Sequence, residues 1–194
     1  MNMTNLAYED WAAEWGEELI GGELVAMAPA AANHVTVAGN IYRIFANFLK
    51  GKRCMAFPDG LIVHLTKDDR FVPDMMVICD RSKIKGDHVD GAPDLAVEVL
   101  SPSTARYDFG RKKTVYGRCG VKEYWIVDPN NRMIQQYLLE EGELRIHDVY
   151  TLCTESQLEI MGPKAREDAM RPSFHCSLFD DLEIRLDEVF ENVL

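Results

Sequence analysis

The sequence predicts an α/β protein in which a mixed β-sheet is flanked by helices on both sides, with an additional β-hairpin toward each end of the chain. Three observations predict this class. Residues 33–50 repeat apolar side chains at the spacing of an amphipathic helix. Residues 93–129 follow the order strand, helix, strand, which usually joins parallel neighbours. Turns containing glycine at residues 21–22 and 140–142 each separate two short apolar runs.

The N-terminal half is expected to form a hairpin, a long helix and then three strands. The segment EELIGGELVAM forms the hairpin, with Gly21 and Gly22 at its turn. Asn33 is the expected N-cap of the helix over residues 33–50, because an Asn side chain can accept a hydrogen bond from the first turn. The runs RCMAF, LIVHL and FVPDMMVIC are rich in residues favoured in strands, so each is expected to form one strand.

The C-terminal half is expected to supply the crossover unit and the second hairpin. The apolar run PDLAVEVL forms a strand that the following SPST sequence ends. A helix over residues 105–119 comes next, and Gly120 closes it in the C-terminal glycine position. EYWIVDP forms the next strand, MIQQYLL and ELRIHDVY form the hairpin, and LDEVFENVL is a short amphipathic segment.

Length and composition predict one domain over residues 1–194, since a chain of this size with 47% hydrophobic residues can bury a single core. The five cysteines are scattered, odd in number and without a CxxC pair, so we expect free, buried thiols in a reducing compartment. The N-terminus has no basic region followed by an apolar run, and no stretch reaches roughly 20 apolar residues. We therefore expect a cytoplasmic protein without a membrane segment.

The net charge of −11 argues against a general phosphate-binding surface, because lysines and arginines supply much of the affinity for nucleic acid. Residues 104–122 are an exception, with six basic residues and a single acid, Asp108. Charge alone allows this stretch to be the solvated face of a helix or a local contact with nucleic acid. In the second case, Arg111, Lys113 and Arg118 are the candidates for contacts with the nucleic-acid backbone.

Asp74 and Glu98 are acids set among apolar neighbours in two segments that should be buried. Buried carboxylates need a partner or a cation. If the two strands pair antiparallel, Asp74 near the start of one lies beside Glu98 near the end of the other. Carboxylate oxygens favour Mg²⁺ or Mn²⁺ over Zn²⁺. The alternatives are a turn position after a proline for Asp74 and a solvent-facing edge position for Glu98.

Three further residues are candidates with an ordinary structural alternative. Asp94 precedes Glu98 by four residues, roughly 13 Å along a strand, so one ion cannot bind both, and Asp94 is either a turn residue or an outer participant. His34 lies in the first turn of the first helix, on its apolar face, and is either a hydrogen-bonded core residue or part of the site. Glu23, after the glycine turn, could also face the site.

Lys112 is the basic residue expected to face the sheet. The apolar stripe of its helix contains Ala105, Phe109, Lys112, Val115, Tyr116 and Cys119. An ammonium group on that stripe needs a carboxylate or a phosphate. The alternative is an i,i+4 ion pair with Asp108, worth about 0.3–0.5 kcal/mol. Arg111 and Lys113 point about 100° to either side, toward solvent or the backbone of a substrate.

Three segments together resemble the Uma-two family of endonuclease-like proteins: GGELVAM, FVPDMMVICD and GAPDLAVEVLSPSTARYDFGRKKTVYGRCGVKEYWIVDP. That family is placed in the PD-(D/E)XK nuclease superfamily, so the resemblance implies a restriction-endonuclease-like fold. It also implies that Asp74 and Glu98 hold Mg²⁺ and that a lysine orients or polarises the attacking water. The chain departs from the superfamily pattern at Leu100, where a lysine would stand; the resemblance places that lysine in the following helix, at Lys112.

The expected function is therefore that of a Mg²⁺- or Mn²⁺-dependent endonuclease that hydrolyses phosphodiester bonds, with DNA as the expected substrate and a homodimer as a possible assembly. The alternative is a nuclease-like module without catalytic activity that binds nucleic acid or a protein partner. The acidic net charge favours the module, whereas the complete set of Asp74, Glu98 and Lys112 favours the enzyme.

Overall fold

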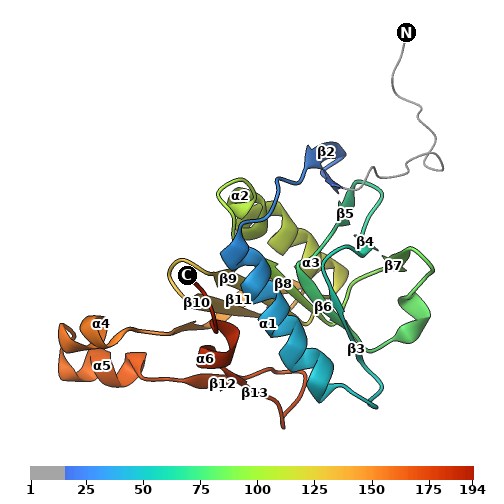
Figure 1. The fold of residues 1–194 in the computed structure, drawn as a ribbon. Helices are drawn as coiled ribbons and strands as arrows, with labels where there is room; N and C mark the ends of the chain where they lie inside the picture. The colour runs from blue at the N-terminus through green and yellow to red at the C-terminus, as the bar shows by residue number, and fades with distance from the viewer. Residues whose placement is uncertain (1–15) are drawn as a thin grey trace.

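The computed structural model describes residues 16–194, and its centre is a six-stranded mixed sheet (Figure 1). The strand order is β11-β10-β9-β8-β6-β3. The strands are β3 (Met55–Pro58), β6 (Met75–Ile78), β8 (Leu95–Val99), β9 (Glu123–Asp128), β10 (Met133–Glu140) and β11 (Glu143–Thr151). β8 and β9 are parallel, as the strand, helix, strand order predicted, and the other neighbours are antiparallel.

Helices cover both faces of this sheet, which confirms the predicted fold class (Figure 1). On one face, α1 (Ala32–Phe48) buries Val37, Ile41 and Phe45 against β6, β8 and β9, together with α6 (Leu186–Val189). The helix of the crossover covers the other face, where Tyr116 packs against the sheet. It comprises α2 (Ala105–Tyr107), a π-helical turn over Asp108–Lys112, and α3 (Lys113–Cys119).

A second, five-stranded sheet lies beside the first, and the sequence did not predict it. Its order is β2-β1-β5-β4-β7. The strands are β1 (Glu17–Ile20), β2 (Glu23–Ala26), β4 (Ile62–His64), β5 (Asp69–Phe71) and β7 (His88–Asp90), and a short 3₁₀ helix covers Arg81–Lys83. β1 and β2 form the expected N-terminal hairpin.

The prediction of one strand over FVPDMMVIC was wrong, because the chain changes sheets within it. β5 ends at Phe71 in the five-stranded sheet, and β6 begins at Met75 in the six-stranded sheet. The intervening Pro73 has no N–H to donate to a ladder, and the N–H of Val72 donates to the side chain of Glu18 at 2.7 Å. Asp74 therefore stands at the entry to β6.

The helix ends show which local signals were reliable. The predicted Asn33 cap was wrong: α1 is capped at Ala31 without a side-chain hydrogen bond, and the Asn33 amide instead binds the backbone of Leu194. The predicted closure at Gly120 is confirmed, since Gly120 ends α3 with φ of 92°, a left-handed conformation that suits glycine.

The C-terminal region contains short elements that the sequence pattern did not reveal. They are α4 (Glu155–Glu159), α5 (Pro163–Ala169), β12 (Ser173–His175) and β13 (Glu183–Arg185). α4 and α5 project away from the two main sheets, whereas β12 and β13 return to cover the α1 side of the core (Figure 1). Phe174 of β12 packs there, with its ring 5.0 Å from that of Trp125.

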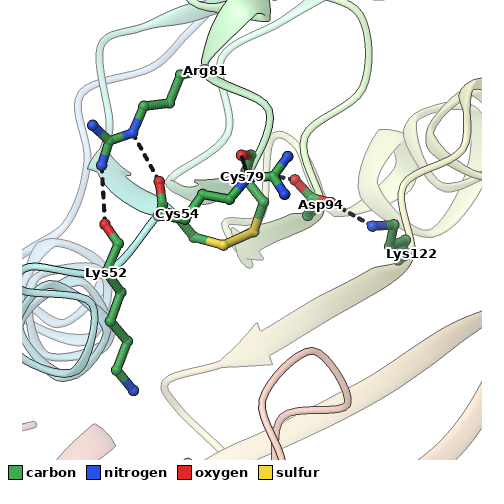
Figure 2. Close-up of a disulfide and its surroundings, with 7 residues drawn as sticks. Lys52, Cys54, Cys79, Arg81, Asp94 and Lys122 are labelled. Atoms are coloured by element: carbon green, nitrogen blue, oxygen red, sulfur yellow. Dashed lines mark hydrogen bonds and ion pairs between the residues drawn. A yellow bond between two sulfur atoms is a disulfide. The ribbon is translucent and has the colours of Figure 1, made fainter.

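The expectation that the cysteines are all free thiols was wrong for one pair. Figure 2 shows Cys54 and Cys79 joined by a disulfide, at adjoining ends of the antiparallel strands β3 and β6. Met55 pairs with Ile78 in the ladder, so the next residues outward face one another. The spacing of the cysteines along the chain does not predict this disulfide, because the register of β3 against β6 brings the two residues together.

Within residues 16–194 no helix is long and apolar enough to cross a membrane. The prediction of one domain over residues 1–194 includes residues 1–15, which lie outside the described residues.

Candidate active site

Asp74 and Glu98 lie on neighbouring antiparallel segments, as the sequence predicted. The β6–β8 ladder pairs Met75 with Val97, so Asp74 and Glu98 stand at the next position of the register. Oδ2 of Asp74 accepts a hydrogen bond from the N–H of Val99 at 2.6 Å, which ties the carboxylate to the end of β8. Both residues line one cavity of about 530 Å³.

Glu98 is 3% exposed, and buried groups determine how its carboxylate is held. The hydroxyl of Tyr116, on α3, donates to Oε1 at 2.8 Å. Oε2 lies 3.1 Å from the ammonium nitrogen of Lys112. Burial raises the pKa of Glu98 well above its usual value, although the charge of Lys112 opposes the shift. A second positive charge in this cavity would favour the ionised carboxylate.

Lys112 reaches the same cavity, whereas Lys113 is absent from its lining. The Lys112 ammonium is 2.9 Å from Oε1 of Glu18 and 3.6 Å from Oδ1 of Asp108, in addition to its contact with Glu98. The local i,i+4 pair with Asp108 is thus one contact of several. Burial lowers the pKa of Lys112, but the surrounding carboxylates outweigh burial and raise it above its usual value.

The π-helical turn helps to explain how a helix residue reaches this position. Residues Asp108–Lys112 form this turn between α2 and α3, so the regular i→i−4 ladder is interrupted where Lys112 enters the cavity. Single π-helical turns of this kind are frequent at functional sites. The sequence predicted an uninterrupted helix over residues 105–119, since a π-turn leaves no mark in an apolar stripe.

Glu18 is a member of the site that the sequence reasoning missed. It lies on β1, is 2% exposed, and contacts both the Lys112 ammonium and the N–H of Val72. Glu23, the residue of the hairpin that we considered, is exposed on β2 and does not line the cavity. Alternation of Glu18 with Ile20 on one strand face was the available signal, because Ile20 is buried.

His34 supports Asp74 from the first helix. Its Nε2 lies 2.9 Å from Oδ1 of Asp74, and both residues line the cavity. Burial lowers the pKa of His34, but the hydrogen bond and charge of Asp74 outweigh burial and raise the pKa above its usual value. His34 therefore holds one oxygen of Asp74 while Val99 holds the other.

The donor set fits a divalent cation. Three carboxylates surround one buried ammonium, those of Glu18, Glu98 and Asp108, and a fourth, that of Asp74, lies near Glu98 in the same cavity. Burial raises the pKa of Asp108 to about 6, although Lys112 opposes the shift. Buried acids in excess of the available basic groups are stabilised by a metal ion, and oxygen donors suit Mg²⁺ or Mn²⁺.

Asp94 is not brought to this cavity. As Figure 2 shows, its carboxylate faces the disulfide end of the sheet: Oδ2 accepts from the N–H of Cys79 at 2.7 Å, and Oδ1 pairs with Lys122 at 2.7 Å. Asp94 stands four positions before Glu98 along extended backbone, as the spacing required. These contacts favour the structural alternative for Asp94.

The three basic residues considered for a nucleic-acid backbone have different surroundings. The Arg111 guanidinium makes two hydrogen bonds to Asp69, at 2.7 and 3.0 Å, so an internal carboxylate already engages it. The Lys113 ammonium lies 4.9 Å from the centre of the Tyr137 ring. Arg118 is exposed on α3 and lines a second cavity, of about 330 Å³, with Arg111. The basic stretch is thus divided among separate contacts.

Acids from two neighbouring segments of the mixed sheet and a lysine from the following helix thus meet at one side of the sheet. This is the arrangement of a restriction-endonuclease-like protein. The family model described as "Uma2: Putative restriction endonuclease" matches residues 7–166. The chain belongs to the Uma2 family.

The chain is also similar to two proteins of Synechocystis sp.. The "Uncharacterized protein slr1290" of Synechocystis sp. is 31% identical over 134 residues, which cover 69% of this chain and 64% of that protein. The match thus spans less than two thirds of that relative. The "Uncharacterized protein sll1609" of the same organism is 28% identical over 124 residues, with 62% of this chain and 70% of that protein covered.

The fold is also seen in a solved structure. It is the crystal structure of a "putative nuclease belonging to DUF820" from Anabaena variabilis, with a TM-score of 0.65, 18% identity and 93% of each chain covered. At this identity the likeness concerns the fold alone.

Proposed function

We propose that the protein is a metal-dependent endonuclease that hydrolyses phosphodiester bonds, with DNA as its substrate. The observation that carries the proposal is the meeting of Asp74, Glu98 and the Lys112 ammonium in one cavity. Asp74 and Glu98 would hold Mg²⁺ or Mn²⁺. When bound, such an ion lowers the pKa of a coordinated water and offsets negative charge on the phosphate.

The residues of the chain orient these ligands and the reactants. His34 and the N–H of Val99 fix the two oxygens of Asp74, and Tyr116 fixes one oxygen of Glu98. Glu18 and Asp108 hold the Lys112 side chain so that its ammonium stays beside Glu98. From that position Lys112 can donate a hydrogen bond to a water or to a phosphate oxygen, which places the nucleophile and favours the developing charge.

Contacts with the substrate backbone are proposed for Lys113 and Arg118, and Arg111 would take part only by leaving Asp69. With a net charge of −11, only local basic groups attract a polyanion, so the binding of nucleic acid should weaken steeply with salt. The cytoplasmic location and the homodimer expected from the sequence stay predictions.

The test combines metal titration with cleavage. Wild type should bind Mn²⁺ by calorimetry and cleave DNA in Mn²⁺ or Mg²⁺, and chelation should stop cleavage. Asp74→Asn and Glu98→Gln should lose both properties. Asp94→Asn is the matched control, because it alters a carboxylate that directly precedes the strand of Glu98 but lies outside the cavity. Equal loss in Asp94→Asn, or cleavage that survives in Glu98→Gln, would contradict the assignment.

A nuclease-like binding module is the second candidate. The observation that favours it is the engagement of Arg111, Lys112 and Lys122 by Asp69, Glu98 and Asp94, which reduces the basic surface for a polyanion. Metal binding without cleavage of single-stranded, double-stranded or branched DNA or RNA would favour the module over the enzyme.

A further inference from the structure

A second group of metal-binding side chains lies on the five-stranded sheet. His64 is the last residue of β4, and His88 and Asp90 are the first and last residues of β7. One ligand atom from each of the three side chains lies within 4.8 Å of the others. None of the three lines the cavity of Asp74 and Glu98. The cluster is therefore separate from the proposed nuclease site.

The sheet register brings these residues together. β4 and β7 are parallel, with Val63 beside Val89 and His64 beside Asp90. Val63 and Val89 are fully buried on one face, so their neighbours along each strand face the other side. The backbone at the cluster is held further by the N–H of Gly91, which donates to the carbonyl of His64 at 2.9 Å. Rigid strands thus position all three side chains.

Both ring nitrogens of His88 lie beside carboxylate oxygens, an arrangement that a bound cation would satisfy. Nδ1 of His88 lies 2.7 Å from Oδ1 of Asp87, and Nε2 lies 3.1 Å from Oδ1 of Asp90. A neutral imidazole carries one N–H and can donate to only one of these carboxylates. The other nitrogen then presents a lone pair to an anion, unless a proton or a metal ion lies between them. Donation of Nδ1–H to Asp87 matches the carboxylate-histidine-metal arrangement of known sites.

His64 supplies the third donor. Its Nδ1 lies 3.8 Å from the same Oδ1 of Asp90, and its ring stacks on that of His88 with centroids 4.2 Å apart. Two ligands of one tetrahedral ion stand about 3.4 Å apart, which the observed 3.1 and 3.8 Å bracket.

The rings must turn toward each other to bind one ion, because their planes are 16° from parallel and the lone pairs lie in those planes. The His64 and His88 side chains are 30% and 25% exposed, so protein atoms do not fully enclose either ring. Arg70, on β5, pairs with His64 of β4. The carboxylates of Asp87 and Asp90 would offset the positive charge of an ion bound near this arginine.

We propose that His64, His88 and Asp90 form a second metal site, selective for a divalent transition ion of the Zn²⁺ type, with a fourth position open to water. Two imidazole nitrogens and one carboxylate oxygen are the donors that Zn²⁺ prefers, in contrast to the oxygen donors around Glu98. Asp87 acts as the positioning residue that fixes the His88 tautomer. A bound ion would join the short edge strand β7 to β4.

The test is calorimetric titration of the metal-stripped chain with ZnCl₂. Wild type should bind Zn²⁺, and His64→Ala and His88→Ala should each weaken that binding at least about tenfold. Asp87→Asn should weaken it by a smaller factor. Two controls should retain wild-type affinity: His147→Ala, which removes an exposed histidine on β11, and Asp74→Asn, which alters the other proposed site. Retention in Asp74→Asn separates this site from the proposed nuclease function.

Two results would overturn the second site. One is the absence of Zn²⁺ binding by wild type at millimolar concentration, and the other is unchanged affinity in both His64→Ala and His88→Ala. If either variant fails to fold, ring NMR signals of wild type decide the matter. Zn²⁺ should then shift the signals of His64 and His88 and leave those of His147 unchanged, and the opposite pattern would reject the site.

Discussion

Lys112 and Glu98 form a buried ion pair, with the ammonium nitrogen 3.1 Å from Oε2. The same ammonium lies 2.9 Å from Glu18, and the two glutamates belong to different sheets: Glu18 to β1 and Glu98 to β8. Lys112 therefore joins the five-stranded sheet to the six-stranded sheet at the proposed active site. Stability and ligand binding should both depend on this one side chain.

Replacing Lys112 with methionine is expected to lower the free energy of unfolding by about 3–5 kcal/mol at pH 8, because buried carboxylates lose their counter-charge. The loss should be smaller at pH 5. Without the ammonium, the folded-state pKa values of Glu98 and Asp108 rise further above the unfolded values of about 4. The stability that protonation provides is fully present below the unfolded pKa and is lost as pH rises through the folded pKa.

Urea unfolding in the presence of a chelator, at pH 5 and pH 8, measures this difference. Lys113→Met is the control, since the Lys113 ammonium contacts the Tyr137 ring and its removal should cost about 1 kcal/mol or less at either pH. An equal loss for Lys112→Met at both pH values would show that the carboxylates do not cause it.

Tyr116→Phe should weaken Mn²⁺ binding by about 10- to 100-fold, because the hydroxyl that holds Oε1 of Glu98 is lost. The cost in folding stability should be about 1 kcal/mol. Tyr124→Phe is a matched control: its hydroxyl is equally buried but donates to the backbone carbonyl of Asp108 at 3.1 Å. Calorimetry on both variants checks the prediction, and similar affinities for the two would remove the positioning role of Tyr116.

The central part of the site was predictable because it lies on strongly patterned elements. Asp74 and Glu98 each interrupt an apolar run, and Lys112 interrupts an apolar helical stripe. A buried acid or base among apolar residues stands out, whatever the exact boundaries of the strand. The strand, helix, strand order likewise predicted the parallel pairing of β8 with β9.

The missing parts depend on contacts between distant segments. Glu18 enters the site only because β1 pairs with β5, and its alternation with Ile20 on one strand face does not by itself show what covers that face. From its helical phase Arg111 was expected to face solvent or the backbone of a substrate, but its guanidinium binds Asp69 on β5, a residue 42 positions away along the chain. Strands of three or four residues, such as β7 and β12, are too short for a periodic signal.

The disulfide between Cys54 and Cys79 predicts a thiol count. Denatured protein without reductant should show three reactive thiols, from Cys119, Cys153 and Cys176, and five after reduction. Reduction should also lower the free energy of unfolding by about 3–4 kcal/mol, given the sequence separation of 25 residues. Thiol titration and mass spectrometry check this on protein purified under oxidising conditions. A Cys119→Ser variant should retain the pair, and five thiols before reduction would exclude the bond.

Asp69 should be a source of acid sensitivity that is independent of the proposed metal site. Its side chain is 3% exposed and accepts hydrogen bonds from Arg111, Gly21 and Thr66. Burial raises the pKa of Asp69, but these hydrogen bonds, that of Arg111 foremost, outweigh burial and hold the pKa below its usual value. A depressed folded-state pKa contributes stability that is present above the unfolded pKa of about 3.9 and is lost as pH falls through the folded pKa.

Asp69→Asn is therefore expected to be less stable than wild type by about 1.5–3 kcal/mol at pH 7, the usual cost of losing hydrogen bonds to a charged group. The difference should persist down to about pH 4 and shrink below it, as wild type becomes protonated. Urea unfolding between pH 2 and pH 7 measures both parts. Arg111→Gln should show the same trend, because it removes the pair from the other side. Asp181→Asn, which alters an exposed carboxylate 3.5 Å from Lys52, should differ little from wild type throughout. A constant difference for Asp69→Asn across the whole range would mean that side-chain packing, rather than the ion pair with Arg111, sets its contribution.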